Sequence, residues 1–105
     1  MSQSVPSGAE PGQDRAAARE LFVQLLELPA GTPERAALRE KLVEVHLPLV
    51  EHLARRFRNR GEPLDDLIQV ATIGLTKSVD RFDPGRGVEF STYATPTIVG
   101  EIKRH

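Results

Sequence analysis

Cysteine is absent from the 105-residue sequence, and only five of its side chains are aromatic. The lack of cysteine excludes a disulfide framework and thiolate metal sites, and it is consistent with a reducing compartment. No run of 18 apolar residues occurs, so the sequence predicts no membrane span. Residues 1–13 also lack the basic start and apolar core of a secretory signal. Together these absences indicate a cytoplasmic protein that does not associate with a membrane.

The sequence also has no large excess of acidic or basic residues, since its formal net charge is −1. Residues 1–54 have a charge balance of −3, whereas residues 55–105 have a balance of +2. A solvated surface of mixed sign explains this distribution without a polyanionic partner. Charge alone therefore does not predict a DNA-binding protein.

Side chains that catalyse reactions in other proteins do not form a recognisable set in this sequence. His46 and His52 are six positions apart and fall on different faces of a helix, which is wrong for two ligands of one metal ion. Glu62, Asp65 and Asp66 cluster where a helix is expected to begin, and the helix dipole explains acidic residues there. The sequence therefore predicts no enzyme, no metal site and no cofactor.

Apolar periodicity predicts the fold. Residues 1–13 contain proline, glycine, serine and glutamine with few aliphatic residues, which predicts a disordered tail. From Asp14 onward, apolar residues recur at steps of three and four, the spacing of amphipathic helices. No stretch alternates apolar and polar residues for long enough to predict a strand. We therefore expect residues 14–105 to form one all-α domain, a compact bundle of four to five helices.

Proline, glycine and capping residues set the expected ends of the first helices. A short helix within residues 14–30 is followed by Thr32, the expected N-cap of the next helix. Pro48 interrupts the apolar stripe of residues 33–60 and predicts a kink or a break. Gly61 is the expected stop of that stripe.

The apolar stripe of residues 64–82 predicts a long helix, and a turn-rich loop follows it. Within residues 83–105, Ser91 or Thr95 is expected to cap a last helix. No glycine, proline or polar cap ends this helix before His105, which indicates a fragment of a longer chain.

Two features are less typical of an ordinary surface or core. Short or neutral polar side chains lie opposite the apolar stripe of residues 64–82, and such a face can accept a helix of another protein; a plain solvated surface is the alternative. Phe90 and Tyr93 lie within four positions of each other, near Arg81 and Arg86. Aromatic rings beside arginines can stack on unpaired bases, which stabilises each base by roughly 1–3 kcal/mol. The alternative is that both rings belong to the core.

The order and spacing of three segments resemble region 2 of the sigma-70 family of bacterial transcription initiation factors. The segments are residues 66–75, 79–83 and 90–94, with the sequences DLIQVATIGL, VDRFD and FSTYA. The resemblance extends without insertion over roughly residues 38–105. Residues 96–104 (PTIVGEIKR) further resemble the stress-response and sporulation subgroup, whose members are often held inactive by anti-sigma factors.

The resemblance implies a role for each part of the chain. Residues 14–30 match the helix that precedes region 2, and residues 33–60 match its first part. Residues 64–82 match the part that binds the clamp coiled coil in the largest subunit of core RNA polymerase, and residues 83–105 match the start of the part that melts the promoter. The implied polymerase contacts are Asp66, Gln69, Thr72 and Thr76. The implied contacts to single-stranded promoter DNA are Arg86, Phe90, Thr92, Tyr93, Lys103 and Arg104.

Tyr93 matches the residue that stacks on the flipped adenine of the minus-ten element. The chain departs from housekeeping members, which usually have an acidic residue and an asparagine at the positions of Val70 and Thr72. They also have a tryptophan pair at the positions of Pro96 and Thr97, so the wedge that these tryptophans form is not expected here. Two other functions are weighed against this one. The first is a repressor that binds double-stranded DNA, but the sequence lacks the basic recognition helix that such a protein needs. The second is a helical interaction module with no nucleic-acid role.

Overall fold

The structure is built from helices. The computed structural model describes residues 11–58 and 61–105, with side chains from residue 16 onward. The elements in chain order are α1 (Pro11–Glu27), α2 (Pro33–Val45), α3 (Leu47–Arg55), α4 (Leu64–Arg81), the 3-10 turn η1 (Pro84–Arg86) and α5 (Phe90–Arg104). No strand occurs in these two ranges. The prediction of an all-α bundle of four to five helices is confirmed.

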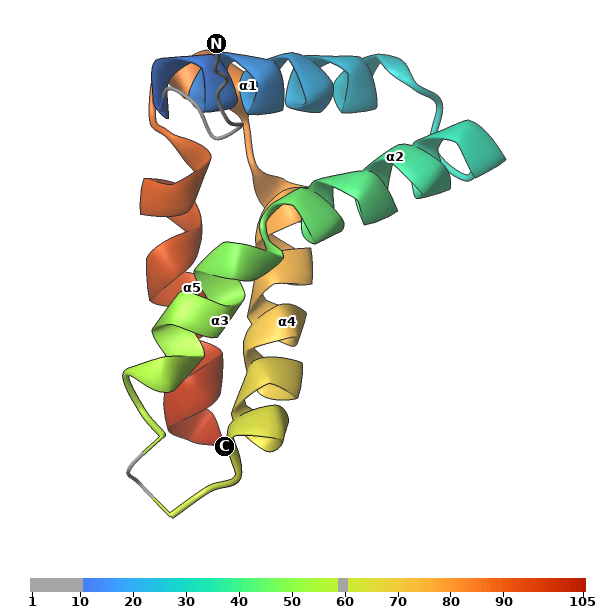
Figure 1. The fold of residues 1–105 in the computed structure, drawn as a ribbon. Helices are drawn as coiled ribbons and strands as arrows, with labels where there is room; N and C mark the ends of the chain where they lie inside the picture. Colours follow the sequence, from blue (N-terminus) through green and yellow to red (C-terminus); the bar gives the residue numbers. More distant parts are fainter. Residues whose placement is uncertain (1–10, 59–60) are drawn as a thin grey trace, which may run out of the picture.

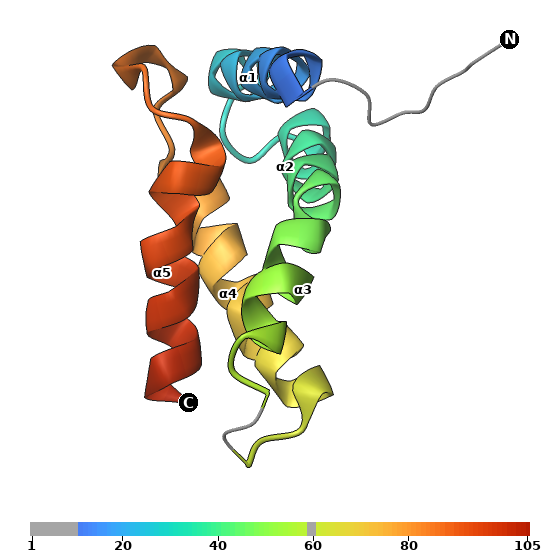
Figure 2. The same cartoon turned by 60° about the vertical axis from the view of Figure 1, so that its left-hand side comes forward.

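Helices α4 and α5 run side by side and share the largest helix–helix interface, and α3 packs against both (Figure 1). Helix α1 lies across one end of the molecule, where it contacts α2 and η1. The C-terminus lies at the opposite end (Figures 1 and 2). The loop between α4 and α5 and the first turn of α5 are therefore close to α1.

The junction between α1 and α2 is fixed by capping. The predicted N-cap is confirmed, because Thr32 Oγ1 accepts a hydrogen bond from the Arg35 backbone N–H at 3.2 Å. The Arg35 guanidinium donates to the carbonyls of Leu25 and Leu28 at 2.6 and 2.8 Å. Leu25 lies in the last turn of α1 and Leu28 directly follows the helix, where carbonyls lack the hydrogen bond to an N–H four residues ahead. Arg35 therefore ties α1 to α2 and holds α1 across the end of the bundle.

The predicted break at Pro48 is confirmed, because α2 ends at Val45 and α3 begins at Leu47. The expected end at Gly61 is wrong, since α3 ends at Arg55. Past that point the backbone tightens into bonds three residues apart, such as the one from Arg56 N–H to the Leu53 carbonyl at 3.1 Å. Gly61 has a positive φ of 87°, but it lies in the connection to α4.

The starts of two helices also differ from expectation. Helix α1 begins at Pro11, three residues earlier than predicted, and proline is well tolerated in a first helical turn. The disordered tail predicted for residues 1–13 is therefore wrong at residues 11–13, which belong to α1, and its residues 1–10 lie outside the described residues. Helix α5 begins at Phe90 with Glu89 as its N-cap, so the prediction that Ser91 or Thr95 caps this helix is wrong. Both residues lie inside the helix, where Thr95 Oγ1 donates to the Ser91 carbonyl at 2.7 Å.

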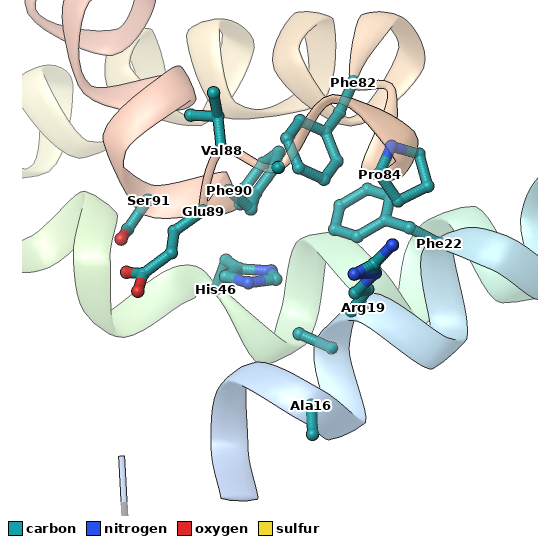
Figure 3. Close-up of a pocket in the computed structure, with 12 residues that line it drawn as sticks. Ala16, Arg19, Phe22, His46, Phe82, Pro84, Val88, Glu89, Phe90 and Ser91 are labelled. Carbon is teal, nitrogen blue, oxygen red and sulfur yellow. The ribbon is translucent and has the colours of Figure 1, made fainter. Parts of the chain in front are cut away.

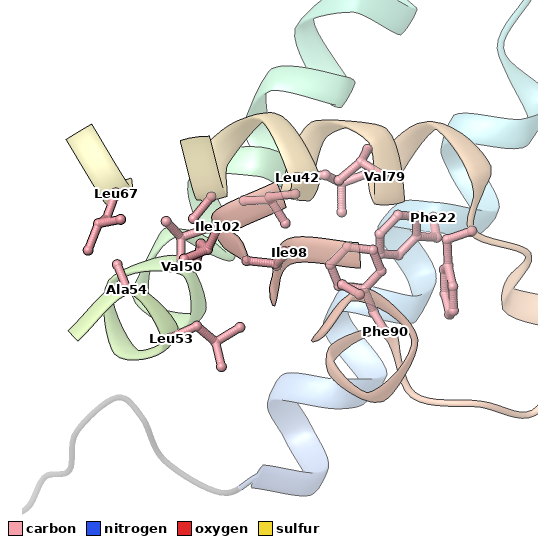
Figure 4. Packing of buried hydrophobic residues seen from close by; sticks show 14 of the residues in the cluster. Phe22, Leu42, Val50, Leu53, Ala54, Leu67, Val79, Phe90, Ile98 and Ile102 are labelled. Carbon is pink, nitrogen blue, oxygen red and sulfur yellow. The ribbon is translucent and has the colours of Figure 1, made fainter. Parts of the chain in front are cut away.

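A continuous apolar core joins all five helices (Figure 4). Gly74 sets the close approach of α4 to α5, because a Cβ atom at this position would lie 2.8 Å from the Ile98 Cα. The buried apolar residues are Phe22, Leu25, Leu42, Val50, Leu53, Ala54, Leu67, Ala71, Leu75, Val79, Phe82, Phe90, Ala94, Ile98 and Ile102.

Candidate nucleic-acid and polymerase interface

The outer face of α4 carries the four polar residues that the sequence singled out. Asp66 and Gln69 are exposed, and Thr72 and Thr76 are half-buried. Thr72 Oγ1 donates to the Ile68 carbonyl one turn earlier at 2.7 Å, so this hydroxyl is directed at its own helix. The strongest hydrogen-bonding groups that this face offers to a partner are therefore the Asp66 carboxylate and the Gln69 amide.

Ile73 is an apolar residue on the same face that sequence reasoning missed. It follows Gln69 by four positions and precedes Thr76 by three, so the three side chains share one side of the helix. Its side chain is 51% exposed. The feature of the sequence that could have identified Ile73 as an exposed residue was its position outside the apolar stripe of the helix. The face that we call the α4 face, Asp66, Gln69, Thr72, Ile73 and Thr76, is thus apolar in part.

Ion pairs link α4 to its neighbours beside this face. The Asp80 carboxylate accepts two hydrogen bonds from the Arg39 guanidinium of α2, at 2.5 and 2.9 Å, and these bonds lower the pKa of Asp80 against an opposing effect of burial. Lys77 Nζ donates to Glu101 Oε2 of α5 at 2.6 Å and lowers the pKa of Glu101. The charges of Asp80 and Lys77 are therefore engaged within the molecule.

Tyr93 stands exposed in the first turn of α5. Its side chain is 37% exposed, and its ring lies 5.3 Å from the ring of Phe82 at an angle of 51°. Thr92 and Arg86 are exposed on the same end of the molecule. Arg86 Nε lies 3.6 Å from Asp83 Oδ2, a loose and exposed ion pair. Three of the predicted DNA contacts are thus accessible and close in the chain.

Phe90 has a different environment from the other predicted DNA contacts. It is only 6% exposed, and its ring packs against Phe22 at 4.8 Å and Phe82 at 5.2 Å. Starting α5 at Phe90 directs this ring into the core, where it also lines the pocket described below, so a contact of the Phe90 ring with DNA stays a prediction. The alternative reading of a core residue holds for Phe90 and not for Tyr93.

Lys103 and Arg104 lie far from this aromatic end. Both are exposed in the last turn of α5, about ten residues or roughly 15 Å along the helix from Tyr93. Arg104 Nη2 donates to Glu101 Oε2 at 2.8 Å. The structure therefore separates the predicted DNA contacts into two groups at opposite ends of α5.

A pocket of about 400 Å³ opens between α1, the α2–α3 junction and the start of α5 (Figure 3). Rings of Phe22, Phe82 and Phe90 form much of its wall, and Arg19, His46, Glu89 and Ser91 supply polar groups. The remaining lining residues are Ala16, Ala18, Pro84, Gly87 and Val88. No local sequence motif predicts this pocket, because its walls come from segments as far apart as residues 16–22 and 82–91.

His46 occupies the break between α2 and α3 and faces the pocket (Figure 3). Its ring lies 4.5 Å from the ring of Phe90 and 6.1 Å from that of Phe22. Nδ1 is 2.8 Å from the Leu42 carbonyl. Burial lowers the pKa of His46, although the bond to Leu42 opposes this shift. The imidazole is therefore held neutral in a fixed orientation.

Within the described residues, Glu62, Asp66 and His105 each place one potential ligand atom within 4.8 Å of the other two. His105 Nε2 lies 3.4 Å from Glu62 Oε1. The contact between the His105 imidazole and the half-buried Glu62 side chain accounts for the closeness of these two residues.

Comparison with known protein families assigns this chain to one of them. The family described as Sigma-70 region 2 matches residues 42–105. This chain belongs to the sigma-70 region 2 family. The resemblance seen in the sequence is thus confirmed.

The relatives are sigma factors. The RNA polymerase sigma-F factor of Kitasatospora aureofaciens is 55% identical over 91 residues, which cover 87% of this chain and 31% of the relative. The RNA polymerase sigma factor SigF of Mycobacterium tuberculosis (strain H37Rv) is 54% identical over 86 residues, covering 82% and 33%. The RNA polymerase sigma-G factor of Bacillus subtilis (strain 168) is 58% identical over 67 residues, covering 64% and 26%. The chain thus spans about a third or less of the length of these relatives, and they are alternative factors, as residues 96–104 indicated.

Proposed function

We propose that this chain is the part of a transcription initiation factor that binds core RNA polymerase and holds the unpaired strand of a melted promoter. The observation that carries the proposal is the position of Tyr93. Its ring is exposed in the first turn of α5, against the same Phe82 ring that walls the pocket. The chemistry of RNA synthesis would belong to the polymerase, so the factor itself would not be an enzyme.

The α4 face is the proposed docking surface for the clamp coiled coil of the largest polymerase subunit. Protein interfaces commonly have an apolar centre and a polar rim. Ile73 supplies an exposed apolar side chain, and Asp66 and Gln69 beside it supply hydrogen-bonding groups. The neighbouring charges of Lys77 and Asp80 are paired within the molecule, so a partner does not have to neutralise them.

Base stacking on Tyr93 is the proposed means of capturing the minus-ten strand. A base leaving the duplex loses stacking at a cost of a few kcal/mol. An aromatic side chain returns roughly 1–3 kcal/mol of that cost. The Phe82 ring supports the Tyr93 ring from behind at 5.3 Å, which limits the freedom that Tyr93 loses when a base binds. Tyr93 therefore favours the open strand over the duplex.

The pocket beside Tyr93 is proposed to receive a second extruded base. Its volume of about 400 Å³ is within the range of small-molecule sites, roughly 300–1,000 Å³. Proteins that bind extruded bases hold them between aromatic or apolar walls and read their edges with a few polar groups. Phe22 and Phe90 supply such walls, and His46 and Ser91 supply such groups. A strand that crosses Tyr93 would reach this pocket past the shared Phe82 ring.

We also propose that an anti-sigma factor, the partner implied by the subgroup, acts by covering the α4 face. Its exposed Ile73 suits an apolar contact, and an occupied face would block docking. We expect the factor in the cytoplasm, and on the nucleoid when it is part of the holoenzyme. Competition between such a partner and core polymerase for the factor is the measurement that checks this regulation.

Replacing Tyr93 by alanine and by phenylalanine in the full-length factor tests the DNA role. Tyr93→Ala should leave binding to core polymerase unchanged and depress transcription from linear duplex promoters, because the stacking surface is lost. A template with a pre-melted minus-ten bubble should rescue this variant in part. Tyr93→Phe keeps the ring and should behave as the wild-type factor on both templates.

Transcription assays on both templates, with thermal melting of each variant, separate the outcomes. Wild-type activity of Tyr93→Ala on closed duplex would contradict the stacking role and favour an interaction module without a nucleic-acid role. Unfolding of Tyr93→Ala, with a loss of about 3–5 kcal/mol as for a buried aromatic residue, would assign Tyr93 to the core.

A further inference from the structure

Side chains from three segments meet where α4 begins. Glu62 lies in the connection before α4, Asp66 lies in the first turn of that helix, and His105 directly follows α5. The helix dipole explains an acidic residue such as Asp66 in a first turn, but it does not explain the approach of an imidazole. The sequence predicts no metal site, because His105 reaches the two carboxylates only through the packing of α5 against α4.

The separation of His105 and Glu62 fits two ligands of one metal ion. His105 Nε2 lies 3.4 Å from Glu62 Oε1, which is longer than the roughly 2.7–2.9 Å of a charge-assisted N–H···O bond. Two ligands of a tetrahedral ion, each about 2.0–2.2 Å from it, lie about 3.4 Å apart. A carboxylate oxygen of Asp66 is within 4.8 Å of both atoms, and Asp66 is exposed, so rotation of its side chain closes the remaining gap.

A hollow of about 150 Å³ lies beside Glu62 and His105. Its other lining residues are Phe57, Leu67, Ile102 and Lys103. The apolar walls strengthen the attraction between a cation and the carboxylates, because they keep screening water away from one side. Lys103 is exposed, so its flexible stem lets the ammonium extend into water. The two negative carboxylates outweigh this single positive charge.

One imidazole nitrogen and two carboxylate oxygens are donors that suit Zn²⁺, and three protein ligands leave a fourth position for water. Ca²⁺ and Mg²⁺ take oxygen ligands instead. We propose that Glu62, Asp66 and His105 bind a divalent ion of the Zn²⁺ class, and that the bound ion opposes docking of core polymerase on the α4 face. The effect on docking rests on the proposed function, because Asp66 belongs to the α4 face and the ion occupies its carboxylate.

Binding of Zn²⁺ alone to the metal-free full-length factor is the first test, measured by isothermal titration calorimetry. His105→Ala, Asp66→Asn and Glu62→Gln should each weaken the binding of one Zn²⁺ equivalent by at least about 10-fold. Losing even a group that only supports a metal ligand costs about 10- to 100-fold in affinity. Mg²⁺ should not displace this equivalent.

His52→Ala and Asp65→Asn are the matched controls, since both residues are exposed and lie outside the group. Both should bind Zn²⁺ as wild type does. All variants should melt like wild type in metal-free buffer, as is usual for surface substitutions. If His105→Ala does not fold, His105→Gln takes its place. Unchanged Zn²⁺ affinity and stoichiometry in the variants of the three ligands would overturn the site.

The effect on docking is measured as the affinity of the full-length factor for core polymerase, with and without saturating Zn²⁺. Wild type and Asp65→Asn should bind about 10-fold more weakly with Zn²⁺, the range of one charge-assisted hydrogen bond. His105→Ala keeps Asp66 but lacks the imidazole, so its affinity should not respond to Zn²⁺.

Two results would overturn the competition between the ion and the polymerase. One is an equal loss of affinity in wild type and His105→Ala, which would assign the effect of Zn²⁺ to another site. The other is unchanged docking of wild type with Zn²⁺ bound. If joint replacement of Asp66 and Gln69 by alanine does not weaken docking, the proposed docking surface fails, while the calorimetric result for the Zn²⁺ site stands by itself.

Discussion

Replacing Gly74 by alanine tests the contact between α4 and α5 that positions Tyr93. Alanine is favoured over glycine inside a helix by about 1 kcal/mol, so propensity alone predicts a gain in stability. The structure predicts the opposite, because the added Cβ would lie 2.8 Å from the Ile98 Cα and 3.1 Å from the Thr97 carbonyl oxygen. Both atoms belong to the backbone of α5, and the contact is relieved only if the helices separate.

Overpacking of a core typically costs about 1–3 kcal/mol, and a backbone clash belongs at the upper end of that range. After subtraction of the gain in helix propensity, we expect Gly74→Ala to destabilise the domain by about 2 kcal/mol. This corresponds to a fall in Tm of roughly 8–16 °C for a domain of this size. Thermal and urea unfolding followed by circular dichroism measure it.

Gly100→Ala is the matched control on α5. The nearest atom to its added Cβ is the Arg104 guanidinium at 3.7 Å, an ordinary contact. This variant should gain about 0.5–1 kcal/mol from helix propensity. If Gly74→Ala were as stable as Gly100→Ala, the close approach of α4 to α5 would be wrong.

Three further predictions address the surfaces. Replacing Asp66 and Gln69 together by alanine should weaken co-purification with core polymerase and leave the free energy of unfolding within about 0.5 kcal/mol of wild type. The control is Leu26→Ser, at an exposed apolar residue of α1, which should bind core polymerase normally. Asp80→Asn should lose at most about 1 kcal/mol near neutral pH, because the pair with Arg39 is close to half-exposed. The pKa of Asp80 is lowered from its ordinary 3.8. The stability difference between wild type and Asp80→Asn should therefore be present above about pH 5 and disappear as the pH falls below 3.8. A difference in urea unfolding that stays constant across this pH range would exclude the ion pair as its source. The chain alone should bind duplex DNA weakly, since a net charge of −1 provides little counterion release; tight, salt-sensitive binding in fluorescence anisotropy would favour a repressor.

Local chemistry made most of the fold predictable. Thr32 and Pro48 act through their own backbone neighbours, so a cap and a helix break could be assigned from the sequence. The end of α3 at Arg55 and the start of α5 at Phe90 were missed, because tertiary packing sets them. Entry of the Phe90 ring into the core, in particular, depends on Phe22 and Phe82.

The candidate site was predictable in part for the same reason. Residues on one helix, such as Asp66 and Gln69, share a face by spacing alone. The sequence could not separate the exposed Tyr93 from the buried Phe90, three positions apart. The pocket was not predictable either, since His46 comes into reach of Phe90 only through the packing of α3 against α5.

Site-specific photocrosslinking tests the central claim most directly. A photoreactive phenylalanine derivative at Ser91, which is exposed and lines the pocket, is placed in the full-length factor, and the holoenzyme is irradiated on a promoter with each strand labelled separately. Our account predicts a crosslink to the non-template strand within the minus-ten element that appears with the open or pre-melted promoter and not with closed duplex. A crosslink to duplex alone, or none to DNA when the open complex has formed, would contradict it.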